Sequence, residues 1–118
     1  MTQAVQIYHN PRCSKSRETL ALLKDNGVEP DVVLYLDTPP EAATLKNLLK
    51  MLGMTSAREL MRQKEDLYKE LNLADSALSE NALIEAMIAH PKLIERPIVV
   101  KNGQARIGRP PEQVLEII

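Results

Sequence analysis

The chain has 118 residues, a length typical of one domain built around a single hydrophobic core. Its 15 basic and 16 acidic residues give a net charge of −1, which disfavours a nucleic-acid surface because phosphate backbones are held by excess Lys and Arg. No apolar run approaches the roughly 18 residues of a membrane helix, and residues 1–6 lack the basic and apolar stretches of a signal peptide. We therefore expect a cytoplasmic protein with neither a membrane nor a nucleic acid as partner.

The first third of the chain predicts a strand, a helix and a second strand. Residues 5–8 alternate in polarity as a strand does, and residues 14–26 carry apolar side chains on one helical face up to Gly27. The compact apolar run 32–36 predicts the second strand. A strand–helix–strand unit of this length predicts two parallel strands joined by a right-handed crossover.

The middle of the chain, approximately residues 39–90, predicts only helices. Thr38 is placed to cap the first of them, Pro39 suits the first helical position and Glu41 would complete a capping box. Apolar residues then recur at helical spacing until Gly53 ends the segment.

Two further helix starts follow in this region. Ser56 and Glu59 have the spacing of a capping box and predict a short helix to about residue 63. Ser79 predicts the cap of a helix over residues 80–90.

The end of the chain changes character. Residues 97–100 predict a strand, Asn102-Gly103 a two-residue hairpin turn, and residues 104–108 the returning strand, before a short helix that begins at Pro110. The order β-α-β, helices, β-β-α predicts an α/β protein with a thioredoxin-like fold. We expect residues 1–118 to form a single domain with an all-helical insert at approximately 39–90.

The chain contains one cysteine, Cys13, so no internal disulfide is possible and any redox chemistry there needs a thiol from outside. Cys13 lies between the first predicted strand and helix, where the helix N-terminus favours an anion and lowers a thiol pKa. Arg12, Arg17 and His9 lie nearby, and Ser16 provides a hydroxyl one helical turn away. These residues suit a nucleophile, although a lone cysteine is also often a small buried apolar residue.

Three sequence blocks carry a resemblance to a known family. Residues 8–17 read YHNPRCSKSR, which resembles the H-N-P-x-C-x-x-S-R segment of glutathione- and glutaredoxin-dependent arsenate reductases. The segments ERPIVV at 95–100 and GRP at 108–110 are similar to a second block, and LMR at 60–62 resembles the segment that supplies a third arginine. Because the blocks occur in the same order over nearly the whole chain, the sequence resembles a short member of this family.

The resemblance implies an arsenate reductase in which Cys13 attacks arsenate, or a similar oxyanion, and forms a covalent thiol–arsenic adduct. Glutathione would serve as co-substrate and glutaredoxin as partner, and no tightly bound cofactor or metal is implied. The arginines that would hold the oxyanion are Arg62, Arg96 and Arg109. The supporting residues would be His9, Ser16, Arg17 and Pro97, the last preceded by a cis peptide bond that faces the cysteine.

Other interpretations stay open at several residues. Arg62 can be a solvated residue of a short helix, and Arg106 is interpreted as a surface residue. His9 either tunes the thiolate or hydrogen-bonds backbone near the loop. Ser14-Lys15 departs from the Gly-Thr that commonly follows the cysteine in this family, and Lys15 adds charge beside the thiolate.

Two other functions compete with arsenate reduction. One is a regulator similar to Spx-type proteins, which bind RNA polymerase, although Ser16 replaces the second cysteine of their usual Cys-x-x-Cys switch. The other is a general glutathione-linked oxidoreductase that acts on mixed disulfides through monothiol chemistry at Cys13. A cysteine phosphatase fits poorly, because only three residues separate Cys13 from Arg17.

Overall fold

A computed structural model describes residues 4–118, so residues 1–3, half of the segment interpreted above for a signal peptide, lie outside the described residues. The chain forms two compact units. One joins the N-terminal part up to Thr38 with Arg96–Ile118, and the other comprises Pro39–Glu95. The single-domain organisation stays a prediction. Along residues 4–118, no helix has both the length and the apolar character needed to cross a membrane.

The first unit contains a four-stranded sheet in the order β2-β1-β3-β4. β1 runs parallel to β2 and antiparallel to β3, and β3 pairs antiparallel with β4. This is the predicted α/β arrangement of the thioredoxin-like fold. Its elements are β1 (Val5–Tyr8), α1 (Ser14–Asp25), β2 (Asp31–Val33), β3 (Ile98–Lys101), β4 (Gln104–Ile107) and the 3-10 helix η3 (Pro111–Glu116).

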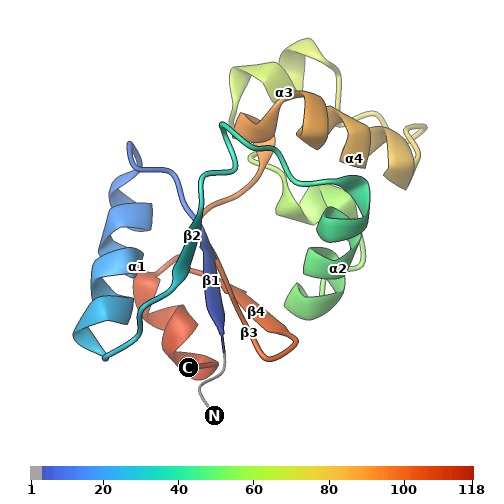
Figure 1. The fold of residues 1–118 in the computed structure, drawn as a ribbon. Helices are drawn as coiled ribbons and strands as arrows, with labels where there is room; N and C mark the ends of the chain where they lie inside the picture. The colour runs from blue at the N-terminus through green and yellow to red at the C-terminus, as the bar shows by residue number, and fades with distance from the viewer. Residues whose placement is uncertain (1–3) are drawn as a thin grey trace. The chain divides into compact units, whose positions relative to one another are not determined.

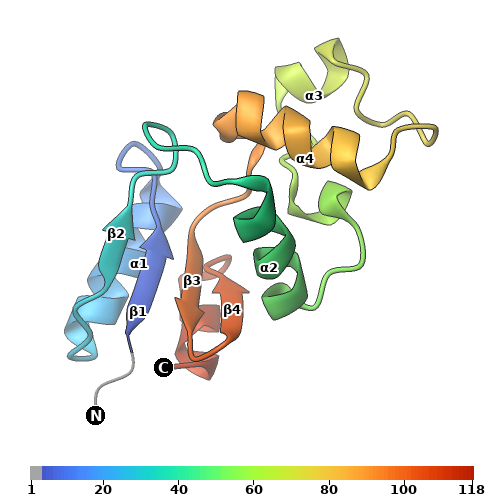
Figure 2. The same ribbon diagram turned by 45° about the vertical axis from the view of Figure 1, so that its right-hand side comes forward.

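The core of this unit lies between the sheet and two helical segments on one of its faces, α1 and η3 (Figure 2). Apolar side chains from all three meet there, because each would otherwise expose its hydrophobic face to water. The buried cluster consists of Val5, Ile7, Leu23, Val99, Val114 and Ile117.

The second strand is shorter than predicted. It ends at Val33 rather than at residue 36, because the chain turns immediately afterwards. The carbonyl of Leu34 accepts hydrogen bonds from the backbone N–H groups of Asp37 and Thr38, at 3.0 Å each. An apolar run by itself does not distinguish strand from turn, so this end of the strand could not be predicted from the sequence.

The predicted hairpin between β3 and β4 is confirmed. Asn102 and Gly103 both have positive φ, 51° and 76°, which is the backbone of a type I′ turn. The turn fixes the register, in which Lys101 pairs with Gln104 and Ile98 with Ile107. The predicted terminal helix is present as η3, in the tighter 3-10 form.

The second unit is helical, apart from an isolated bridge between Met61 and Ile94 (Figure 1). α4 packs against α2, η1 and η2. The elements are α2 (Ala42–Leu52), η1 (Ala57–Leu60), α3 (Asp66–Glu70), α4 (Glu80–Ala89) and η2 (Pro91–Leu93), the two η segments being 3-10 helices.

The predicted cap at Thr38 is wrong. α2 begins at Ala42, with Glu41 in the N-cap position. The reason lies in the two prolines, since a residue that precedes proline is sterically disfavoured in the helical conformation and Pro39 precedes Pro40. The predicted end of this helix at Gly53 is confirmed by its left-handed φ of 73°.

The two later helix starts are confirmed, but the first helix is shorter than expected. Ser56 and Glu59 form a capping box at η1, which ends at Leu60 because Met61 is extended and pairs with Ile94. The hydroxyl of Ser79 accepts a hydrogen bond from the N–H of Ala82 at the start of α4.

Glu80 connects α4 to η1, and we expect its removal to destabilise the second unit. Its carboxylate accepts hydrogen bonds from the N–H of Ala57 at 2.7 Å and the hydroxyl of Ser56 at 2.8 Å. Glu80→Gln should lower the free energy of unfolding by about 0.5–1 kcal/mol at pH 7, a small value because the group is exposed to solvent. Urea unfolding measures this, with Glu85→Gln on the exposed face of the same helix as the control.

The pH dependence gives a second check on Glu80. The hydrogen bonds from Ala57 and Ser56 lower the pKa of the Glu80 carboxyl below its ordinary value of 4.5. A lowered folded-state pKa stabilises the protein above pH 4.5, and this contribution disappears as the pH falls through the folded pKa. The difference between wild type and Glu80→Gln should therefore shrink in acid, and a difference that stays constant from pH 7 to pH 3 would contradict the assignment.

Candidate active site

Cys13 occupies the N-cap position of α1. Figure 2 shows the loop between β1 and α1 to which this position belongs. Its backbone is extended, with φ −94° and ψ 124°, and α1 starts at the next residue. The side chain is 8% exposed. Because the first N–H groups of a helix have no partner within the helix, the sulfur lies beside unpaired donors and the positive end of the helix dipole.

The loop before Cys13 is held by its own backbone and by Asn10. The N–H of His9 donates to the carbonyl of Val33 at 2.9 Å, which fastens the loop to β2. The side-chain oxygen of Asn10 accepts a hydrogen bond from the N–H of Arg12, and the backbone carbonyl of Asn10 accepts one from the N–H of Cys13, both at 3.0 Å. Asn10 was not among the predicted site residues, although an Asn before a proline is a known signal for this kind of turn.

A buried hydrogen-bond network joins this loop to the first turn of α1. The Oγ of Ser16 lies 2.6 Å from Nδ1 of His9 and accepts from the N–H of Asn10 at 3.0 Å. Ser16 is fully buried and His9 is 6% exposed. Burial and the charge of Arg17 lower the pKa of His9 below its ordinary 6.5, which favours the neutral ring.

Two of the predicted arginines lie at the same end of the sheet as Cys13. Nη2 of Arg109 is 3.8 Å from the Cys13 sulfur, and its Nε donates to the carbonyl of Arg96 at 2.9 Å. The peptide bond between Arg96 and Pro97 is cis, as predicted. The fold thus brings close to Cys13 two arginines that lie 83 and 96 residues further along the chain.

The register of the strands explains this arrangement. Tyr8 of β1 pairs with Ile98 of β3, and Ile98 pairs with Ile107 of β4. The residues just beyond this row are the β1–α1 loop, the Arg96-Pro97 segment and the Gly108-Arg109 segment. All three therefore emerge at one end of the sheet.

These surroundings lower the pKa of the Cys13 thiol. Burial alone raises it, because the charged form loses water. The backbone N–H of Ser16, the charge of Arg96, the N–H of Lys15 and the charge of Arg109 together more than offset that effect. The pKa of Cys13 is thus lower than the ordinary 9.0, which suits a nucleophilic thiolate.

The other predicted arginines have different surroundings. Arg17 is exposed, and its Nη1 lies 3.4 Å from the carbonyl of Pro11. Arg62 belongs to the second unit, where its guanidinium forms an ion pair with Glu65 at 2.8 Å. Arg106 pairs with Glu116 at 3.0 Å on a partly exposed surface, in agreement with its interpretation as a surface residue.

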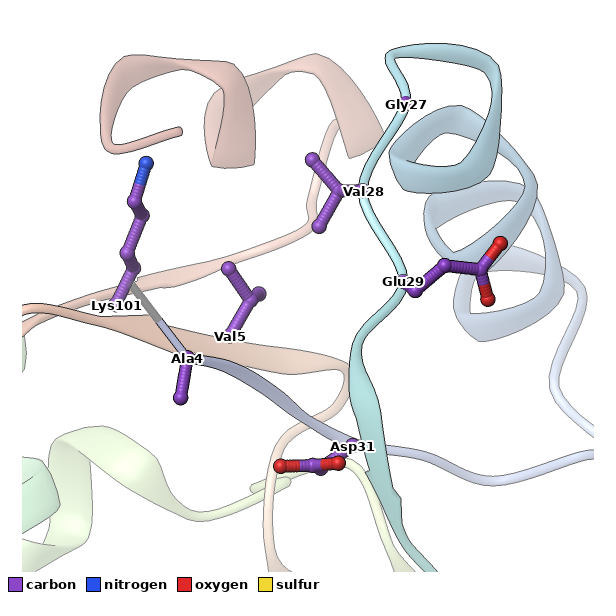
Figure 3. A pocket seen from close by; sticks show the side chains of 7 residues that line it. All are labelled: Ala4, Val5, Gly27, Val28, Glu29, Asp31 and Lys101. Carbon is purple, nitrogen blue, oxygen red and sulfur yellow. The ribbon is translucent and has the colours of Figure 1, made fainter. Parts of the chain in front are cut away.

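A depression lies at the opposite end of the first unit, beside the start of β1 (Figure 3). The described residues that line it include neither the thiol nor an arginine, so its chemistry differs from that at Cys13. They are Ala4, Val5, Gly27, Val28, Glu29, Asp31 and Lys101. Among residues 4–118, no group of three or more His, Cys, Asp or Glu side chains is placed to hold a metal ion.

The fold and the site define a thioredoxin-like protein with one cysteine at a helix N-terminus and two arginines beside it. The ArsC family model matches residues 8–117. The chain is 80% identical to the uncharacterized protein YfgD of Escherichia coli (strain K12), over 100% of this chain and 99% of YfgD. It is 51% identical to an arsenate reductase of Neisseria meningitidis serogroup B, over 97% of each chain.

Solved structures agree with these sequence relatives. The structure of an arsenate reductase from Vibrio cholerae superimposes with a TM-score of 0.97 at 64% identity, over 100% of both chains. The protein therefore belongs to the ArsC family.

The lowered pKa of Cys13 gives a direct prediction. The rate of alkylation by iodoacetamide, followed against pH, should show a midpoint below 9.0 in the wild type. Arg109→Gln should raise that midpoint by about one pH unit, because it removes a positive charge beside the thiolate. Arg106→Gln in β4 serves as the control and should leave it unchanged. Equal midpoints for wild type and Arg109→Gln would contradict the electrostatic role.

The hydrogen bonds of Ser16 predict a stability effect. Ser16→Ala leaves the buried His9 ring and the N–H of Asn10 without this partner, and should lower the free energy of unfolding by about 1–3 kcal/mol. Ser14→Ala removes an exposed hydroxyl from the same helical turn and should change it by less than about 0.5 kcal/mol. Urea denaturation compares the two, and equal effects would show that the network does not stabilise the loop.

Proposed function

We propose that the protein is a glutathione- and glutaredoxin-dependent arsenate reductase in which Cys13 is the nucleophile. The observation that supports this most directly is the 3.8 Å approach of an Arg109 nitrogen to the Cys13 sulfur at the start of α1. A thiolate beside two guanidinium groups and helix N–H donors suits attack on a tetrahedral oxyanion. Relatives that are named arsenate reductases and share 51% of its residues favour arsenate as that oxyanion.

In the first step the Cys13 thiolate would attack the arsenic atom of arsenate. A sulfur–arsenic bond forms, one arsenate oxygen leaves as water after protonation, and the arsenic stays pentavalent. Arg96 and Arg109 would hold the remaining oxygens and offset their charge, since a planar guanidinium can donate two parallel hydrogen bonds to an oxyanion.

In the second step glutathione would supply the electrons. Its sulfur forms a disulfide bond with Cys13, the electron pair of the sulfur–arsenic bond passes to arsenic, and arsenite leaves with trivalent arsenic. Cys13 then carries glutathione as a mixed disulfide. A glutaredoxin thiolate would attack the glutathione sulfur and release the Cys13 thiolate, which agrees with a chain whose sequence has one cysteine.

The remaining residues would support the nucleophile. His9 and Ser16 would fix the β1–α1 loop through their 2.6 Å hydrogen bond. Arg17 would add by its charge to the effect of burial, which lowers the pKa of the His9 ring. A third oxyanion contact from Arg62 stays a prediction of the sequence resemblance, which Arg62→Lys in the assay below would test.

The decisive assay follows arsenate-dependent NADPH oxidation coupled through glutathione, glutaredoxin and glutathione reductase. Cys13→Ser should abolish turnover, and Arg96→Gln or Arg109→Gln should lower kcat/KM by about a hundredfold, as the loss of one charge-stabilising donor does in other enzymes. Arg106→Gln should retain wild-type activity, because Arg106 of β4 forms an ion pair with Glu116 of η3 and not with the thiol.

The competing functions predict other outcomes in the same experiment. A general glutathione-linked oxidoreductase would remove glutathione from mixed disulfides with Arg96→Gln and Arg109→Gln as active as the wild type. A polymerase-binding regulator would show no arsenate turnover and would be retained by the polymerase α subunit in a pull-down. Either result would replace arsenate reduction as the assigned function.

A further inference from the structure

Gly108 lies between β4 and Arg109 and is buried in the first unit. Its φ lies outside the left-handed region, so its backbone conformation is open to any residue. What it lacks is space for a side chain. A Cβ atom built on Gly108 would overlap Oγ1 of Thr19 and lie 2.9 Å from Cγ of Pro97 and 3.1 Å from Cγ2 of Thr19.

Both neighbours of Gly108 belong to segments that carry the site. Thr19 is fully buried in α1, and its hydroxyl donates to the carbonyl of Lys15 at 2.8 Å, in the helical turn that follows Cys13. Pro97 is buried and directly follows Arg96, and its carbonyl accepts a hydrogen bond from the N–H of Gly108 at 2.9 Å. The backbone at Gly108 therefore lies in close contact with both α1 and the Arg96-Pro97 segment.

Arg109 is the next residue along the chain, and its two side-chain contacts depend on where that backbone lies. Its Nε reaches the carbonyl of Arg96 at 2.9 Å, and its Nη2 lies 3.8 Å from the Cys13 sulfur. A displacement of the backbone at Gly108 would therefore change the position of the guanidinium relative to the sulfur. The added methyl group requires its neighbours to move, because the atoms it meets belong to a buried threonine and a proline ring.

We propose that Gly108 is a positioning residue, whose missing side chain lets the end of β4 approach Thr19 and Pro97 closely enough to place the Arg109 guanidinium at the Cys13 sulfur. It touches neither the sulfur nor an oxyanion and acts through Arg109. The inference rests on the proposed role of Cys13 as a nucleophilic thiolate, but it does not depend on which oxyanion the thiolate attacks.

The test is the pH midpoint of Cys13 alkylation, which needs no substrate. Gly108→Ala should raise the midpoint by about half a unit to one unit, approaching the value for Arg109→Gln. A purely structural glycine would lower the unfolding temperature and leave the midpoint at its wild-type value. Leu23→Val, a fully buried change in the core of the same unit, is the matched control for destabilisation and should not move the midpoint.

A double-mutant cycle asks whether Gly108 acts through Arg109. In an Arg109→Gln background, Gly108→Ala should add little further shift, because the charge that it displaces is already gone. Full additivity of the two shifts would overturn the proposal, as would an unchanged midpoint in folded Gly108→Ala protein.

A second substitution that removes the steric overlap at Thr19 gives an independent test of the proposal. Thr19→Ala removes both threonine atoms that the new methyl group would meet, so Gly108→Ala combined with Thr19→Ala should have a midpoint closer to the wild type than Gly108→Ala alone. Where Gly108→Ala alone does not fold, the double variant is compared with Thr19→Ala. Because the new methyl group would still meet Pro97, the double variant should have a slightly higher midpoint than Thr19→Ala. Equal midpoints for these two variants would overturn the proposal. A protein that shows these shifts without arsenate turnover would lose the proposed substrate and retain the positioning role of Gly108.

Discussion

A partly desolvated thiolate is costly, and the first unit is organised around the groups that offset this cost. Burial of Cys13 by itself opposes ionisation. The N-terminus of α1 supplies backbone N–H donors, and Arg96 and Arg109 supply charge, so the pKa of the thiol falls below its ordinary 9.0. The effect of each group weakens with its distance from the sulfur. The rest of the unit serves to hold the helix start and the arginine segments close to one sulfur atom.

Strand pairing is the main interaction that holds these segments close to the sulfur. Cys13 and Arg109 are 96 residues apart in sequence, and hydrogen bonds from β1 to β3 and from β3 to β4 bring them to one end of the sheet. The type I′ turn at Asn102-Gly103 fixes the register of the hairpin. Because a shift of one residue in a strand would reverse the direction of every side chain, the turn also determines where Arg109 emerges.

The polar network around His9 has a complementary role. The imidazole joined to Ser16 anchors the loop from inside and leaves the positive charge beside the thiol to the arginines. This division separates the residues that shape the loop from the arginines that lie beside the thiol. It also gives Ser16 a structural reason to be present at the position where dithiol oxidoreductases carry a second cysteine.

The sequence by itself determined the order of the elements, the hairpin turn and the place of Cys13 before a helix, because these follow from local periodicity and turn chemistry. It did not determine the end of β2 after Val33 or the start of α2 at Ala42, where a turn and a Pro-Pro steric clash compete with apolar and capping patterns. Cys13, Arg96 and Arg109 were identified from motifs, yet their proximity is a property of the folded sheet. The close approach of Gly108 to Thr19 and Pro97 was decided by tertiary structure alone, since no local pattern reports how much space surrounds a glycine that could adopt any conformation.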